Sequence, residues 1–204
     1  MKSRQGEPES RANMLWGAFP PAWVRHAERL RRSAEVLWRP LDHVLMAESP
    51  LTESELREWD HIYAFLLVAG AALEAILKAA AMQARFNAEW QLAAIVTPDW
   101  KLQKWLTTHH LDVYAEKAGI VLSPAEREQL ARFERYVVWR ASYPVPKDLR
   151  DPRPDHLLKL DFHASNFDWI WFDRFYRRAE EAYQRHVNEF EKLKAARAQA
   201  DENE

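Results

Sequence analysis

The feature that most constrains this chain is a long run of apolar residues at helical spacing in its first half. Across residues 52–85, apolar side chains recur every three or four positions, which is the period of one face of an α-helix. The middle of this run is apolar nearly all round, so we expect a central helix that other helices cover on most sides. A capping box formed by Thr52 and Glu55 marks its predicted start.

The same run bears on where the protein works. Its longest uncharged part covers residues 62–73, whereas a membrane-spanning helix needs about 20 apolar residues, so we expect a buried core helix and no membrane partner. The N-terminal residues 1–13 hold no apolar run of the kind that a secretory signal requires. Cysteine is absent, as is usual for proteins of a reducing compartment. These observations predict a cytoplasmic protein.

Two charged residues, Glu74 and Lys78, interrupt the central helix four positions apart. A buried carboxylate is costly unless it is paired, so we expect Lys78, or an arginine from a neighbouring helix, to neutralise Glu74. A structural pair is the favoured interpretation. A contact of Arg140 with Glu74 or His109 would instead favour a catalytic one.

A second apolar stripe predicts a helix over residues 22–47, which Pro40 should kink because proline removes one amide donor. Its other face carries arginines that would suit a phosphate-binding strip. Glutamates four residues before some of them favour a solvated face with ion pairs instead. The residues concerned are Arg25, Arg29, Arg32 and Arg39, with Glu28 and Glu35.

The second half of the chain predicts further helices separated by an irregular segment. We expect a short helix over residues 109–118 ended by Gly119, and another from the Ser123 capping box to about Arg140. Four prolines make residues 141–164 an irregular connection, after which a helix should run from Ser165 to about Ala198. The stretch "WIWFDRF" (169–175) has more rings than one helix face can bury, so some should point outward, into a dimer interface or under the 141–164 segment.

These patterns together predict the fold class and the domain organisation. We expect an all-α protein, an up-and-down helical bundle of five to six helices, with one domain over residues 21–198. The polar segment 1–20 should be disordered, and residues 199–204 should fray. Only four glycines occur in 204 residues, which argues against glycine-rich phosphate loops and tight β-hairpins.

Charge and motif content narrow the function only by exclusion. The chain has 29 basic and 31 acidic residues and a formal charge of −2, so overall charge does not argue for nucleic-acid binding, although a local basic groove would fit. No motif predicts a cofactor. The best metal-ligand cluster has a spacing that matches no known zinc motif, so no metal is expected either. That cluster consists of Asp155, His156, Asp161 and His163.

Two segments resemble the HEPN superfamily of helical, nucleic-acid-associated proteins. "FLLVAGAALEAILKAAAM" (65–82) is similar to the family's core helix, in which Glu and Lys stand on an apolar helix. "HHLDVYAEKAGIVLSPAEREQLARFERYVVWRASYPVP" (109–146) resembles a second block that ends in a Tyr-Pro motif. The resemblance implies a HEPN-like bundle that works as a homodimer, with RNA or a protein as partner, in a defence or toxin–antitoxin context.

The resemblance also implies where a site would lie. His109 falls at the family's helix-opening histidine, while Trp139 and Tyr143 fall at its aromatic positions. Glu74 and Lys78 fall at the polar positions of its core helix. Ser142 stands where this branch has arginine, and Arg140 lies two residues earlier. From the residues alone, a histidine that opens a helix is expected to hydrogen-bond backbone.

Many HEPN proteins are metal-independent endoribonucleases that use an arginine followed after four to six residues by a histidine. Such cleavage needs a base for the ribose 2′-hydroxyl and a cation for the phosphate. The only match here is Arg150 and His156, in a proline-rich stretch rather than at a helix start. A non-catalytic binding module is therefore preferred. A ribonuclease using Arg150 and His156, or His109 and Arg140, and an unrelated helical interaction bundle remain alternatives.

Overall fold

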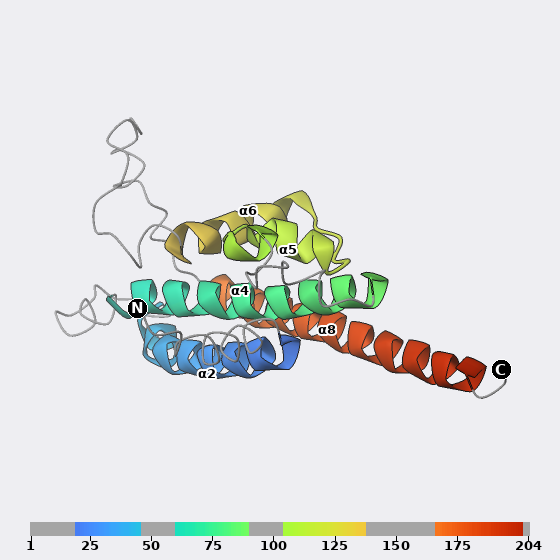
Figure 1. Ribbon diagram of the computed structural model, residues 1–204. Coiled ribbons are helices and arrows are strands. Elements are labelled where there is room, and N and C mark those ends of the chain that lie inside the picture. Colours follow the sequence, from blue (N-terminus) through green and yellow to red (C-terminus); the bar gives the residue numbers. More distant parts are fainter. Residues whose placement is uncertain (1–18, 46–59, 90–103, 138–165, 202–204) are drawn as a thin grey trace, which may run out of the picture.

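The computed structural model describes residues 19–45, 60–89, 104–137 and 166–201 (Figure 1). Within these ranges the chain is helical and contains no strand, which confirms the all-α prediction. The elements are α2 (Pro20–Leu45), α4 (Asp60–Glu89), the 3₁₀ turn η2 (Lys104–Thr107), α5 (Leu111–Lys117), α6 (Pro124–Arg135) and α8 (Asn166–Asp201).

Helix α4 is the centre of the fold, as the apolar run predicts. It contacts α2, α5, α6 and α8 and lies between α2 on one side and α5 and α6 on the other (Figure 1). Its part from Ala64 to Ala88 is long and apolar enough to cross a membrane, but 83% of that window is buried inside the bundle. The covering helices therefore account for its apolar surface.

Helix α2 packs along α4 through small and aromatic residues. Ala27, Ala34 and Leu41 are fully buried, and Trp38 lies against Phe65 of α4 with ring centroids 4.8 Å apart. The helix continues past Pro40 to Leu45. Its outer face carries the expected ion pairs, with Arg32 lying 3.7 Å from Glu28 and Arg39 lying 2.9 Å from Glu35.

Local signals set the ends of α5 and α6. Gly119 has φ +72°, the left-handed conformation that suits glycine after a helix. Both arms of the Ser123–Glu126 capping box form, since the Ser123 hydroxyl accepts from the Glu126 amide and the Glu126 carboxylate accepts from the Ser123 amide. Helix α6 ends at Arg135 and a π-helical turn follows at residues 136–137.

Helix α8 differs from its prediction in two ways. It extends to Asp201, three residues beyond its predicted end. The surplus rings do not point freely outward, because α8 is flanked by α2 and α6. Trp169 stacks against Trp38 of α2, and Trp171 stacks against Phe133 of α6, with ring centroids 6.5 Å and 5.6 Å apart. Both tryptophans are partly buried, whereas Ile170 between them is exposed.

Several predictions fall outside the described residues. These are residues 1–18 of the segment 1–20 that was predicted to be disordered, the Thr52 cap, the end of the predicted helix beyond residue 137, the 141–164 connection and the Ser165 cap.

Candidate functional site

Three of the residues singled out by sequence, Glu74, Lys78 and His109, come together at the junction of α4 with the start of α5. The Lys78 Nζ donates to Glu74 Oε1 at 2.5 Å. The His109 Nδ1 lies 3.0 Å from Glu74 Oε2 and 3.2 Å from Oε1. Glu74 is therefore shared between a helical neighbour and a residue 35 positions away. We call these three residues the Glu74 cluster.

Lys78 is enclosed within this cluster, with a side chain only 5% exposed. Its Nζ lies over two aromatic rings, 5.3 Å from the centroid of Trp23 in α2 and 5.2 Å from that of Tyr114 in α5. A cation in this position is attracted to the electron-rich ring faces as well as to the carboxylate. The ammonium group thus joins three helices, α2, α4 and α5.

His109 occupies the outer side of the cluster, where its side chain is 49% exposed. The expectation that a helix-opening histidine bonds backbone is wrong, because both histidines here contact carboxylates. His110, at the N-cap of α5, makes no side-chain cap hydrogen bond and instead lies 3.0 Å from Glu134 Oε1. The other Glu134 oxygen accepts from the backbone amide of Leu111 at 3.1 Å. Glu134 of α6 therefore caps α5.

Tyr114 completes the inner side of the site and was not singled out by sequence. It is fully buried, and its hydroxyl donates to the Thr108 carbonyl at 2.5 Å. Burial raises the pKa of Tyr114 from 10.0 to about 12; the Glu74 and Glu134 carboxylates add to the rise and the Thr108 hydrogen bonds oppose it. A tyrosine three residues after Leu111 on an amphipathic helix reads as a core residue, so sequence offers no signal for this position beside Lys78.

The remaining predicted site residues cannot be placed in the cluster. Trp139, Arg140, Tyr143, Arg150 and His156 all lie outside the described residues.

Metal binding has no support in the described part of the chain. No group of three or more His, Cys, Asp or Glu side chains is arranged there to hold a metal ion. The candidate ligands between residues 155 and 163 belong to the undescribed segment.

The arrangement of the Glu74 cluster allows two chemical roles. A buried carboxylate that accepts from histidine Nδ1 fixes the orientation of the imidazole, which is how carboxylates orient catalytic histidines. The same carboxylate is neutralised by Lys78, which makes the cluster a satisfied polar tie within an apolar core.

Comparison with known proteins gave no match. No family model matches the chain, and neither the curated proteins nor the solved structures contain a match. The HEPN resemblance therefore remains a prediction from the two sequence segments.

Proposed function

We propose that this chain is a HEPN-like, non-catalytic binding module that takes RNA or a protein partner. It works as a cytoplasmic homodimer in a defence or toxin–antitoxin context. The observation that carries the proposal is the closed pairing within the Glu74 cluster. The HEPN part of the proposal comes from the sequence resemblance, and the binding role without catalysis comes from the state of the cluster.

The packing of the two segments that resemble HEPN proteins supports the proposal of a HEPN-like bundle. The segment 65–82 lies in α4, and the second block begins with α5 and α6, which both contact α4. The helices α4 and α6 approach closely at Gly70, where an added Cβ would lie 2.6 Å from Val137 Cγ2 and 3.0 Å from the Phe133 carbonyl oxygen. The Glu74–His109 contact ties the same two segments together.

The buried pairing of Lys78 with Glu74 supports the proposal that the module is non-catalytic. RNA cleavage without metal needs a cation that can reach the phosphate as negative charge develops in the transition state. The Lys78 ammonium group is 2.5 Å from Glu74 and almost fully buried, so it cannot serve a phosphate at the surface. The cluster thus acts as a structural tie that positions α5 and its surface against α4.

A cleavage and binding assay on total RNA without metal tests the proposal. Wild-type protein should leave RNA intact and retard it on a native gel. An Arg150→Ala/His156→Ala variant should also leave it intact. The matched control is His26→Ala/Arg29→Ala, which removes the same residue types from the exposed face of α2. Cleavage by wild type and by the control, but not by Arg150→Ala/His156→Ala, would overturn the non-catalytic proposal.

The gel also separates the two kinds of partner. Intact, unshifted RNA at every protein concentration would exclude RNA as the ligand and leave a protein partner within the proposal. An RNA shift that the His26→Ala/Arg29→Ala control weakens would place the α2 arginines in the RNA-binding surface, against their interpretation as a solvated face.

One observation favours a second candidate function, a metal-independent endoribonuclease with His109 as base. The imidazole is half exposed while its Nδ1 is held by Glu74, and a histidine oriented in this way can accept a proton from a ribose 2′-hydroxyl. In that case wild-type protein would cleave RNA and the His109→Ala variant would not. The Arg150→Ala/His156→Ala variant would retain it.

A further inference from the structure

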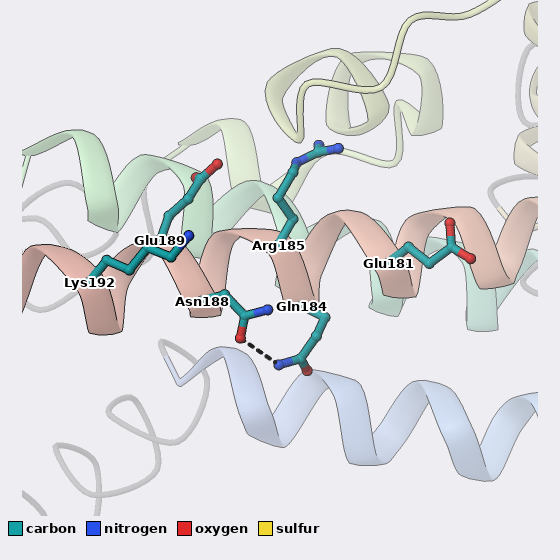
Figure 2. Close-up of a pocket in the computed structure, with 6 residues that line it drawn as sticks. All are labelled: Glu181, Gln184, Arg185, Asn188, Glu189 and Lys192. Carbon is teal, nitrogen blue, oxygen red and sulfur yellow. Dashed lines mark hydrogen bonds between the residues drawn. The ribbon is translucent and has the colours of Figure 1, made fainter.

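The outward face of α8 carries a polar stripe that lines a shallow open recess (Figure 2). All of its residues come from this one helix and are exposed. We call them the α8 stripe: Glu181, Gln184, Arg185, Asn188, Glu189 and Lys192.

The spacing of the α8 stripe is the same read in either direction. Successive members are separated by three, one, three, one and three positions. Two copies of such a stripe can face each other in antiparallel orientation about a two-fold axis, which is the geometry of an isologous contact, and this places the two ends of the stripe opposite each other.

The charges of the stripe are complementary to themselves in that orientation. Glu181 faces Lys192 of the partner subunit, and by symmetry Lys192 faces Glu181 of the partner subunit. Arg185 and Glu189 project from the same side of α8, opposite to Gln184 and Asn188 (Figure 2). A two-fold axis places the same side of each helix together, so Arg185 and Glu189 of the partner subunit lie on the same side of the contact. They are offset by one residue, about 1.5 Å along the helix axis. No like charges face each other.

Contacts within the protein hold the stripe in this arrangement. The Gln184 amide donates to Asn188 Oδ1 at 3.3 Å. Glu189 lies 3.0 Å from His186 Nδ1, and His186 is itself fixed by the Ala118 carbonyl oxygen at 3.0 Å. Arg185 Nη2 reaches the same carbonyl oxygen at 3.5 Å. Four of the six stripe residues thus have contacts within the protein, which lowers the entropic cost of ordering those side chains on association.

The end of α8 gives an independent reason for a partner. Residues 191–201 are exposed along their whole length, and the helix extends past the rest of the bundle (Figure 1). Most helical stability in proteins comes from packing one face against a neighbour, and this segment has no buried face of its own. An antiparallel second copy centred on the stripe would lay its own α8 along this segment.

We infer that the α8 stripe is a docking surface for a second copy of this chain, which pairs antiparallel through Glu181–Lys192 and Arg185–Glu189 contacts. This pairing rests on the homodimer of the proposed function and deepens it by naming the surface through which the two copies meet, whereas the RNA assays do not depend on that surface. Because its ion pairs are at the surface, the association weakens as salt rises.

Charge reversal tests the pairing by sedimentation equilibrium at low salt. The mass of wild-type protein should rise with concentration from 24.1 kDa toward twice that value. Glu181→Lys/Glu189→Lys and Arg185→Glu/Lys192→Glu should each weaken self-association about tenfold or more, because like charges then face each other. An equimolar mixture of the two variants should associate as wild type does. Circular dichroism checks that each variant is folded.

The matched control, Glu28→Lys/Glu128→Lys, changes the net charge equally but lies on α2 and α6, and it should associate as wild type does. Three results would each overturn the pairing alone. They are variants that both stay dimeric, a mixture that does not recover association, and a control that is as impaired as the stripe variants. A wild type that is monomeric at all concentrations would overturn the pairing together with the proposed homodimer.

Discussion

At the scale of single residues, the buried Glu74–Lys78 pair governs how the core tolerates change. Removing one partner of a buried pair leaves the other charge without compensation, which costs more than the pair itself contributes. We predict that Glu74→Ala lowers the free energy of unfolding by about 3–5 kcal/mol, because the Lys78 ammonium then stays buried without a carboxylate. Urea denaturation measures the change.

The matched variant is Glu74→Leu/Lys78→Leu, which replaces both charges by apolar groups and should recover most of the lost stability. His109 is half exposed, so water can take the place of the missing carboxylate there. A Glu74→Ala variant that unfolds within about 1 kcal/mol of wild type would mean that the pair behaves as a surface ion pair.

Tyr114 predicts how stability depends on pH in alkaline solution. Folding raises the pKa of Tyr114 from 10.0 to about 12, so the folded state holds this proton more tightly than the unfolded state does. The resulting stability is complete below pH 10 and is lost as pH rises toward 12. Burial raises the pKa of Tyr176 in the same direction. Tyr114→Phe should therefore reduce, without abolishing, the slope of unfolding free energy against pH in this window.

Denaturation at several pH values measures that slope. At neutral pH the variant should be less stable by about 1 kcal/mol, because it lacks the hydrogen bond to Thr108. The difference in unfolding free energy between wild type and Tyr114→Phe should narrow as pH rises, because only wild type loses the contribution of the Tyr114 proton. An unchanged slope would show that Tyr114 ionises as easily in the folded state as in the unfolded state.

The site residues differ in how far sequence could predict them. The Glu74–Lys78 pair is a contact between residues four apart on one helix, so helical geometry alone predicts it. The Glu74–His109 and Glu134–Leu111 contacts join residues 35 and 23 positions apart. They depend on how α4, α5 and α6 pack, and periodicity within one helix carries no information about that packing.

At the scale of elements, the crossing of α4 and α6 depends on Gly70. In an exposed helix, replacing glycine by alanine is usually stabilising by up to about 1 kcal/mol. Here we predict the opposite sign, a loss of about 1–3 kcal/mol in Gly70→Ala, because the new methyl group meets Val137 Cγ2 and the Phe133 carbonyl oxygen. Thermal and urea denaturation give the sign directly.

A second substitution separates the two clashes at Gly70. Val137→Ala removes the nearer side-chain atom, so Gly70→Ala/Val137→Ala should recover part of the loss but not all of it, since the Phe133 carbonyl is backbone. If Gly70→Ala is stabilising, the two helices do not approach as closely as described.

Element boundaries show the same division between local and distant causes. The Ser123 capping box and the left-handed Gly119 were predictable because they are set by residues within one turn. The placement of Trp169 and Trp171 was not, because it depends on two neighbouring helices covering both flanks of α8. Ring count on one helix therefore overestimates its exposed aromatic surface when the helix has neighbours on two sides.

At the scale of the whole molecule, the bundle has a buried apolar helix at its centre and a polar helix end extending beyond it. The buried centre was predictable from the apolar run, and the polar helix was predicted to about Ala198, three residues short of its end at Asp201. The Glu74 cluster connects the centre to the surface through the half-exposed His109. We propose that this connection is structural.

The most direct measurement of that claim compares the stability and the RNA cleavage of His109→Ala with those of wild type. We predict intact RNA with both proteins and a loss of about 1 kcal/mol in the unfolding free energy of His109→Ala, because the variant lacks the hydrogen bond to Glu74. Cleavage by wild type that disappears in an equally stable His109→Ala variant would contradict this prediction and make His109 a catalytic base.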